Sequence, residues 1–114
     1  MSRADVLGER RIRDVVPVFA ALGDETRLSL LARMGQASSL SVTDLTASAV
    51  MTRQAISKHL RVLEEAGLVR SARVGRERRW KVERTGLAEA RRCMDALSAQ
   101  WSEGLERLRR LVEE

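Results

Sequence analysis

The stretch "TRQAISKHLRVLEEAG", Thr52–Gly67, decides how this chain is expected to fold. Coiled into a helix, it places Ile56, Leu60 and Leu63 on one side, at the i, i+4, i+7 spacing of a buried stripe. Its first residue can cap the N-terminus, and its final glycine can end the helix. The opposite side carries basic and hydrogen-bonding residues: Arg53, Gln54, Ser57, Lys58 and Arg61. The stretch is therefore predicted to be a helix with one face in the core and a basic face in solvent.

Three shorter helices are predicted before this stretch. Their expected N-caps are Asp14, Asp24 and Ser41, and the last of these opens a capping box, "SVTD". Pro17 is tolerated in the first turn of the first helix, where the backbone N–H groups lack helical partners. The apolar residues predicted to face the core are Val15, Val16, Phe19 and Leu22 in the first helix, Leu28, Leu31 and Met34 in the second, and Val42 and Leu45 in the third.

The pattern changes after Gly67. In "LVRSARVGRERRWKV", residues 69–74 and 78–82 are predicted to be two short strands, and Gly75 lies in the turn between them. Trp80 is expected to pack this hairpin against the domain. A helix then runs from about Thr85 onward. Its apolar residues keep a heptad spacing: Leu87, Ala90, Met94, Leu97, Trp101, Gly104, Leu108 and Leu111. Such a seam packs against another helix, and a partner subunit is favoured over the chain's own domain.

Positive charge is concentrated in one third of the chain. The net charge is +5 over 114 residues. Residues 52–82 hold nine basic and three acidic residues, a net charge of +6, and the remainder is at −1. A polyanionic partner is the natural inference, with a merely soluble basic face as the alternative. An enzyme is the weakest interpretation, because the chain has one histidine, one cysteine and no phosphate-binding glycine loop or paired acid and base.

The order helix, turn, helix and basic hairpin predicts a winged helix-turn-helix: mainly α, with a small β-hairpin wing. We expect a single domain over 1–114, with the helix-turn-helix at about 41–66, the wing at about 69–82 and a C-terminal dimerisation helix at about 85–112. The second helix of this motif enters the DNA major groove, where Arg can bond guanine and Gln can bond adenine. The residues expected in the groove are Arg53, Gln54 and Lys58. Those expected on the DNA backbone are Thr52, Ser57, Arg73, Arg76, Arg78 and Arg79.

Three segments resemble the ArsR/SmtB family of bacterial winged-helix repressors. They are "ALGDETRLSLL", "TRQAISKHLRVLEEAGLV" and "RSARVGRERRWKV", and the resemblance covers nearly the whole chain. It implies a homodimer joined through the N- and C-terminal helices, and repression of a promoter from a palindromic operator. The residues expected at the dimer interface are Val15, Phe19, Met94, Leu97, Trp101, Leu105 and Leu108.

Many members of that family sense metals, and this sequence departs from both of their sites. The run "SLSVTDL", Ser39–Leu45, has Ser41 and Thr43 where the metal-sensing members have two thiolates. Hydroxyls are poor ligands for soft or borderline metals. The second family site uses histidine and carboxylates of the C-terminal helix, but residues 84–114 contain no histidine. We therefore expect no metal dependence and no cofactor.

Two further residues have two interpretations each. Cys93 lies beside Arg91 and Arg92, which could favour thiol oxidation or pairing across a dimer, but a small core residue is the favoured interpretation. His59 either contacts DNA or, as we favour, makes a structural hydrogen bond at the end of the recognition helix.

The leading hypothesis is thus a metal-independent, homodimeric DNA-binding repressor with double-stranded DNA and itself as partners. A redox- or ligand-gated repressor and a winged-helix protein-interaction module are the alternatives. The effector and the operator sequence are not encoded in any motif. No apolar run is long enough for a membrane span, and "MSRADVLGERRIRD" lacks the apolar core of a secretory signal. With a single cysteine, a cytoplasmic location is expected.

Overall fold

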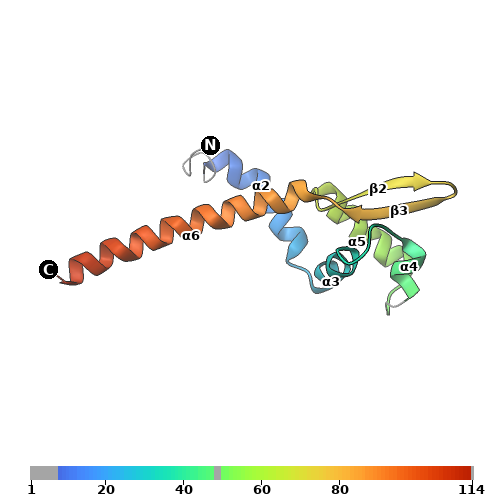
Figure 1. Cartoon of the computed structure of the whole chain (residues 1–114), viewed down its shortest axis with the longest axis horizontal. Coiled ribbons are helices and arrows are strands. Elements are labelled where there is room, and N and C mark those ends of the chain that lie inside the picture. The colour runs from blue at the N-terminus through green and yellow to red at the C-terminus, as the bar shows by residue number, and fades with distance from the viewer. Residues whose placement is uncertain (1–7, 48–49, 114) are drawn as a thin grey trace.

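The computed structural model describes residues 8–47 and 50–113. Figure 1 shows a small body from which two elements extend: the long helix α6 on one side and the β2–β3 hairpin on the other. The strand order is β1-β3-β2, with both pairs antiparallel. This is the expected winged-helix architecture, with one more short strand than the sequence predicted. The elements are α2 (Glu9–Leu22), α3 (Glu25–Met34), β1 (Leu40–Ser41), α4 (Val42–Ala47), α5 (Arg53–Glu65), β2 (Val69–Val74), β3 (Glu77–Val82) and α6 (Arg84–Glu113).

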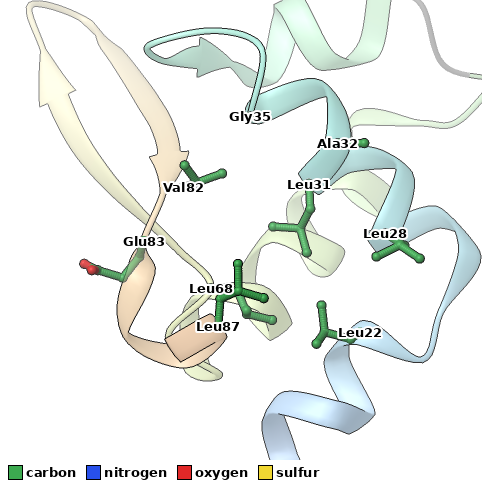
Figure 2. A pocket seen from close by; sticks show the side chains of 9 residues that line it. All are labelled: Leu22, Leu28, Leu31, Ala32, Gly35, Leu68, Val82, Glu83 and Leu87. Carbon is green, nitrogen blue, oxygen red and sulfur yellow. The ribbon is translucent and has the colours of Figure 1, made fainter. Parts of the chain in front are cut away.

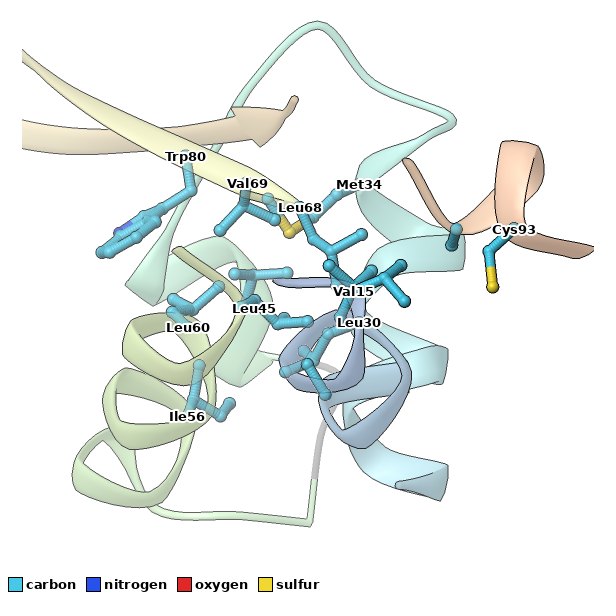
Figure 3. Packing of buried hydrophobic residues seen from close by; sticks show 14 residues of the cluster. Val15, Leu30, Met34, Leu45, Ile56, Leu60, Leu68, Val69, Trp80 and Cys93 are labelled. Carbon is cyan, nitrogen blue, oxygen red and sulfur yellow. The ribbon is translucent and has the colours of Figure 1, made fainter. Parts of the chain in front are cut away.

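The core lies where α5 meets α2, α3, α4 and the base of the hairpin (Figure 3). Ile56, Leu60 and Leu63 each have an exposed fraction of 0%, so the stripe predicted for this helix is confirmed. Leu45 of α4 and Met34 of α3 are equally enclosed. Removing these side chains from water is the main stabilising term, and it fixes the rotation of α5 about its own axis.

Three predicted N-caps are confirmed. The Asp24 carboxylate accepts a bond from the Arg27 backbone N–H at 3.0 Å, and the Thr52 hydroxyl accepts one from the Ala55 N–H at 3.1 Å. Ser41 and Asp44 form a reciprocal pair, in which each backbone N–H donates to the other's side chain at 3.0 Å. These bonds satisfy donors that the first turn of a helix leaves unpaired.

The first helix differs from the prediction. It begins at Glu9 after Gly8, so Asp14 is not its cap, and Pro17 lies inside it. Glu and Arg are good helix formers, and an acidic residue suits the first turn, so "ERRIRD" extends the helix toward the N-terminus. The buried face also differs: Val16 is 53% exposed, while Val15, Val18 and Ala21 are buried at i, i+3, i+6 spacing.

One other face was predicted with the wrong rotation, and one residue of the predicted α6 seam is buried within the chain. In α3 it is Leu30, 4% exposed, that joins Met34 in the core, and Leu28 is 54% exposed. The residues that α6 buries within the chain are small: Gly86, Ala90, Cys93 and Ala96, and the helix packs against α2. Small side chains let the two helices pack closely. Val15 and Ala90 are therefore covered within the chain itself, and their assignment to a partner's interface is corrected.

The larger apolar residues of α6 remain exposed in the single chain: Leu87, Met94, Leu97, Trp101, Leu105, Leu108, Leu111 and Val112. We call this set the α6 stripe. Among the described residues, no helix combines the length and the apolar character needed to cross a membrane.

Candidate nucleic-acid interface

The two helices of the helix-turn-helix are joined by side chains as well as by packing. Arg33 of α3 donates to the carbonyls of Asp44 and Leu45, at 3.1 and 3.0 Å, and so holds the six-residue helix α4 from behind. Arg53, the first residue of α5, donates to the Thr43 hydroxyl at 2.9 Å. Arginine suits both positions because its planar group can donate to several acceptors at once. The angle between α4 and α5 is thus set by bonds as well as by the core.

The outward face of α5 is the one that the sequence predicted for DNA. Because its apolar stripe is enclosed, Arg53, Gln54 and Lys58 are exposed on the other side, and Ser57 is half-buried. The first two lie in the first turn, where unpaired backbone N–H groups also present partial positive charge. A DNA base edge or phosphate could be met here by side chains and by the helix terminus together.

The wing adds a second basic surface. β2 and β3 are paired from Val69↔Val82 to Val74↔Glu77, and Gly75 takes a left-handed conformation, φ 66°, in the turn between them. Arg73 lies directly opposite Arg78, and Arg76 is exposed in the turn itself, after Gly75. Like charges opposite each other on a hairpin are destabilising. An anion bound between them would relieve that repulsion.

A polar cavity of about 300 Å³ separates the recognition helix from the wing. On one side of it, Arg78 donates to the Ser71 hydroxyl at 2.8 Å, and Ser71 donates to the Glu64 carboxylate at 3.2 Å. Trp80 closes another side, as its predicted packing role requires, and is 8% exposed. Within residues 8–47 and 50–113, its indole N–H is the one buried side-chain polar group that lacks a hydrogen-bond partner.

Arg79 behaves differently from the other wing arginines. Its guanidinium donates to the hydroxyl and to the carbonyl of Ser39, both at 2.9 Å, and forms ion pairs with Asp44 and Glu77. The side chain therefore fastens β3 to the start of α4. The predicted contact of Arg79 with the DNA backbone is revised, because its charged group is already engaged by Ser39, Asp44 and Glu77.

His59 is half-buried and faces α3, where Arg27 Nη1 lies 3.4 Å from its Nδ1. This arrangement matches the structural hydrogen bond that we favoured over a DNA contact. Sequence reasoning missed the role of Arg27, which also donates to the carbonyls of Ala21 and Ala20 at 2.8 and 3.1 Å. Its position three residues after an N-cap was the available signal, but nothing local identifies its acceptors.

Cys93 is buried within the small-residue face of α6, against the chain's own core. The structure therefore supports the favoured interpretation of a small core residue. The alternative of a disulfide between two Cys93 residues across a dimer is dropped, because this thiol is buried in the chain's own core and is not part of the exposed α6 stripe. Phe19, also expected at the dimer interface, packs partly against the same core.

A second cavity, of about 390 Å³, is almost wholly apolar (Figure 2). Leu22, Leu28 and Leu31 approach it from α2 and α3, while Val82 and Leu87 approach it from the end of β3 and the start of α6. Leu68, which follows α5, forms its floor. The cavity thus lies between the helices that carry the core and the base of the wing.

Comparison with known proteins agrees with this geometry. Residues 22–72 match a helix-turn-helix domain family. The chain is 45% identical over 67 residues to the uncharacterized HTH-type transcriptional regulator YuzN of Bacillus subtilis, covering 54% of this chain and 73% of that protein. It is 32% identical over 95 residues to the HTH-type transcriptional regulator Rv2034 of Mycobacterium tuberculosis, covering 83% and 85%.

Solved structures extend the agreement to the whole fold. An ArsR-like transcriptional regulator from Rhodococcus sp. RHA1 has a TM-score of 0.82 and 37% identity, covering 89% of this chain and 92% of that one. The AntR antimony-specific transcriptional repressor has a TM-score of 0.61 and 30% identity, covering 89% and 87%. Identity at this level over nearly complete chains, with the same winged-helix architecture, goes beyond a shared fold. The chain belongs to the ArsR family of winged helix-turn-helix transcriptional regulators, which are DNA-binding proteins and not enzymes.

Proposed function

We propose that this regulator is a repressor that binds a palindromic operator as a homodimer in the cytoplasm. The observation that carries the proposal is the orientation of α5. Its apolar stripe is completely enclosed, so Arg53, Gln54 and Lys58 are turned outward on the side opposite the core. The exposed Arg73 and Arg76 of the wing would add contacts to the DNA backbone. Arg78 would join them, with Thr52 and Ser57 at the start of the helix.

The homodimer is supported by the α6 stripe. Large apolar side chains in a row cost free energy in water, and a second copy of the chain offers the same stripe as a cover. A two-fold dimer reads two half-sites about one helical turn apart, which is why a palindrome is proposed. Repression is supported by the relative at 30% identity that is itself a transcriptional repressor.

Metal independence is supported by what the hydroxyls of α4 do. Ser41 accepts the Asp44 N–H within the capping box, and Thr43 accepts a bond from Arg53. Both side chains are used to build the helix-turn-helix, and neither is a good ligand for zinc or for a metalloid.

The test is binding of chelator-treated protein to the DNA upstream of its own gene and to a scrambled duplex, followed by fluorescence anisotropy across a salt series. We expect selective binding whose affinity falls steeply with salt, because phosphate contacts release counterions. Zinc and antimonite, each added in excess, should leave the affinity unchanged. Release by either ion would overturn metal independence. Equal binding to both duplexes would show that the protein does not regulate its own gene through this DNA. A binding affinity that hardly changes with salt would favour a protein partner instead of DNA.

A second candidate, regulation by a small apolar ligand, is favoured by the cavity of about 390 Å³. Its size falls within the range of small-molecule sites in proteins. Because its walls come from α3 and from the base of the wing, filling it would change their spacing. Ala32→Trp would fill the space; operator binding that is altered by this variant would support gating through the cavity, and unchanged binding would count against it.

A further inference from the structure

We propose that Arg27 is a positioning residue that holds the recognition helix through His59, and that operator binding therefore requires His59 to be uncharged. This inference rests on the proposed function, because it concerns how α5 is presented to DNA. Arg27 lies outside the DNA-binding face, and the affinity for operator is expected to fall as the pH falls.

The first step is how Arg27 itself is fixed. Helix α2 ends at Leu22, so the carbonyls of its last turn lack helical donors. Arg27 supplies them: Nε donates to Ala21 and Nη2 donates to Ala20. Its backbone N–H is meanwhile bound by the Asp24 cap. With these bonds the guanidinium has one orientation, and its Nη1 is directed at α5.

The second step is the contact with α5. Arg27 Nη1 lies 3.4 Å from His59 Nδ1, and both side chains are half-buried. A guanidinium has only donors and keeps its charge at every accessible pH, so Nδ1 must be the acceptor. A neutral imidazole with its proton on Nε2 supplies that acceptor. This single contact joins the end of α2, the start of α3 and the middle of the recognition helix.

The third step is what protonation would do. A second proton on Nδ1 removes the acceptor and places two cations against each other. Asp24 also faces the histidine and attracts its charged form, but its carboxylate is already bound to the Arg27 backbone. Lys58, the neighbour of His59 on α5, is exposed and adds to the repulsion. Because the added proton would lie on the very atom that faces the guanidinium, we expect acid to loosen α5 from α3.

The chain makes a clean experiment possible because His59 is its only histidine. Operator affinity would be measured at about pH 7.5 and about pH 5.5, a window in which no other side-chain type ordinarily titrates. We expect the affinity of the full-length protein for operator to fall about tenfold on acidification, the size of one lost charge-assisted hydrogen bond. If His59 instead touched a DNA phosphate, its added charge would strengthen binding. An increase in affinity would therefore overturn the proposal.

Two variants of His59 serve as matched controls. In His59→Asn the amide oxygen can take the place of Nδ1 as an acceptor and does not titrate. We expect this variant to bind like the parent at the higher pH and to lose the acid effect. His59→Phe keeps a ring without an acceptor, and should bind about tenfold more weakly at both pH values. Equal behaviour of the two variants would contradict a role for the acceptor.

A measurement without DNA separates this inference from the proposed function. The parent and His59→Asn would be unfolded in urea at the same two pH values. We expect acid to lower the midpoint of the parent more than that of the variant, because only the parent loses the contact. If no protein bound operator selectively, the proposed function would fail while this comparison still tested the contact. Identical shifts in the two midpoints would refute it.

Discussion

Gly86 lies in the first turn of α6, where this helix passes the turn that follows α5. Its N–H donates to the Gly67 carbonyl at 2.9 Å. A Cβ at this position would come within 2.5 Å of the Ala66 carbonyl oxygen and 2.9 Å of the Gly67 oxygen. These are backbone atoms that cannot rotate away. The absence of a side chain is thus what allows the long helix to start beside the recognition helix.

We therefore predict that Gly86→Ala destabilises the protein by about 1–3 kcal/mol, the usual cost of overpacking. The matched control lies in the same helix: Ala88 is exposed and lies outside the apolar seam. Ala88→Ser should change the stability by no more than about 0.5 kcal/mol, as is usual at the surface. Urea unfolding at one fixed protein concentration measures both. A stable Gly86→Ala protein would mean that α6 can shift away from Gly67.

Gln54 is the exposed residue of the first turn of α5 with the most specific hydrogen-bonding pattern. We predict that Gln54→Ala costs about 1–3 kcal/mol on the true operator and relaxes its sequence preference, because an amide reads a base edge. Arg76→Ala in the wing is the control: it should weaken all DNA equally and lower the salt slope by about 1. Anisotropy titrations against operator and scrambled DNA measure both effects. Unchanged selectivity in Gln54→Ala would show that another part of α5 meets the bases.

Among the elements, α4 depends most on its caps. Six residues are too few for a helix to persist alone in water, so the capping box and the bonds from Arg33 must hold it. The Ser41 backbone N–H, and then its hydroxyl, lower the pKa of Asp44 below its ordinary value. The Arg27 N–H does the same for the pKa of Asp24 at the start of α3.

A carboxylate with a lowered pKa in the folded state contributes stability above its unfolded pKa, and this contribution is lost as the pH falls through the folded value. We predict that the urea midpoint of the parent protein declines below about pH 4, near the ordinary pKa of an aspartate. Asp44→Asn should be less stable at neutral pH and should lose less on acidification. Glu65→Gln, at an exposed carboxylate of the same motif, is the control. An equal acid dependence in Asp44→Asn and the parent would contradict the capping argument.

Elements with strong local signals were predicted correctly, and rotations that depend on a distant partner were not. The stripe of α5, the caps at Asp24, Ser41 and Thr52, and both wing strands follow from spacing and capping chemistry. Leu28 and Val16 fit the helical period equally well, but the position of neighbouring helices turned them outward. The acceptors of Arg27 and Arg79 lie 6 and 40 residues away, so no motif could reveal them.

The whole molecule is far from compact. Its radius of gyration is 18.5 Å, against about 13 Å for a compact domain of this length. Its extents of 68 × 27 × 21 Å reflect α6, which projects well beyond the body in Figure 1. The projecting half has no core of its own chain to lie against, yet it carries Trp101, Leu105 and Leu108 on one side. A second copy of the chain that covers this side of α6 would bury these side chains in a shared dimer interface.

We predict that Trp101→Glu, in which a charge replaces a side chain that is 69% exposed in the single chain, prevents dimer formation. A charge at the centre of an apolar interface cannot be solvated there, so the dissociation constant should rise by at least about a hundredfold. Arg110→Gln is the matched control, because it makes the same change of one unit of charge on the opposite side of α6. Sedimentation equilibrium should find twice the 12.8 kDa chain mass for the parent and for Arg110→Gln, and the single mass for Trp101→Glu. Operator affinity should fall only in the monomeric variant, since one half-site provides about half of the contacts. If Trp101→Glu stayed dimeric, the stripe would not be the interface; if the parent were monomeric and still selective for its operator, the two-fold symmetry proposed for the complex would be wrong.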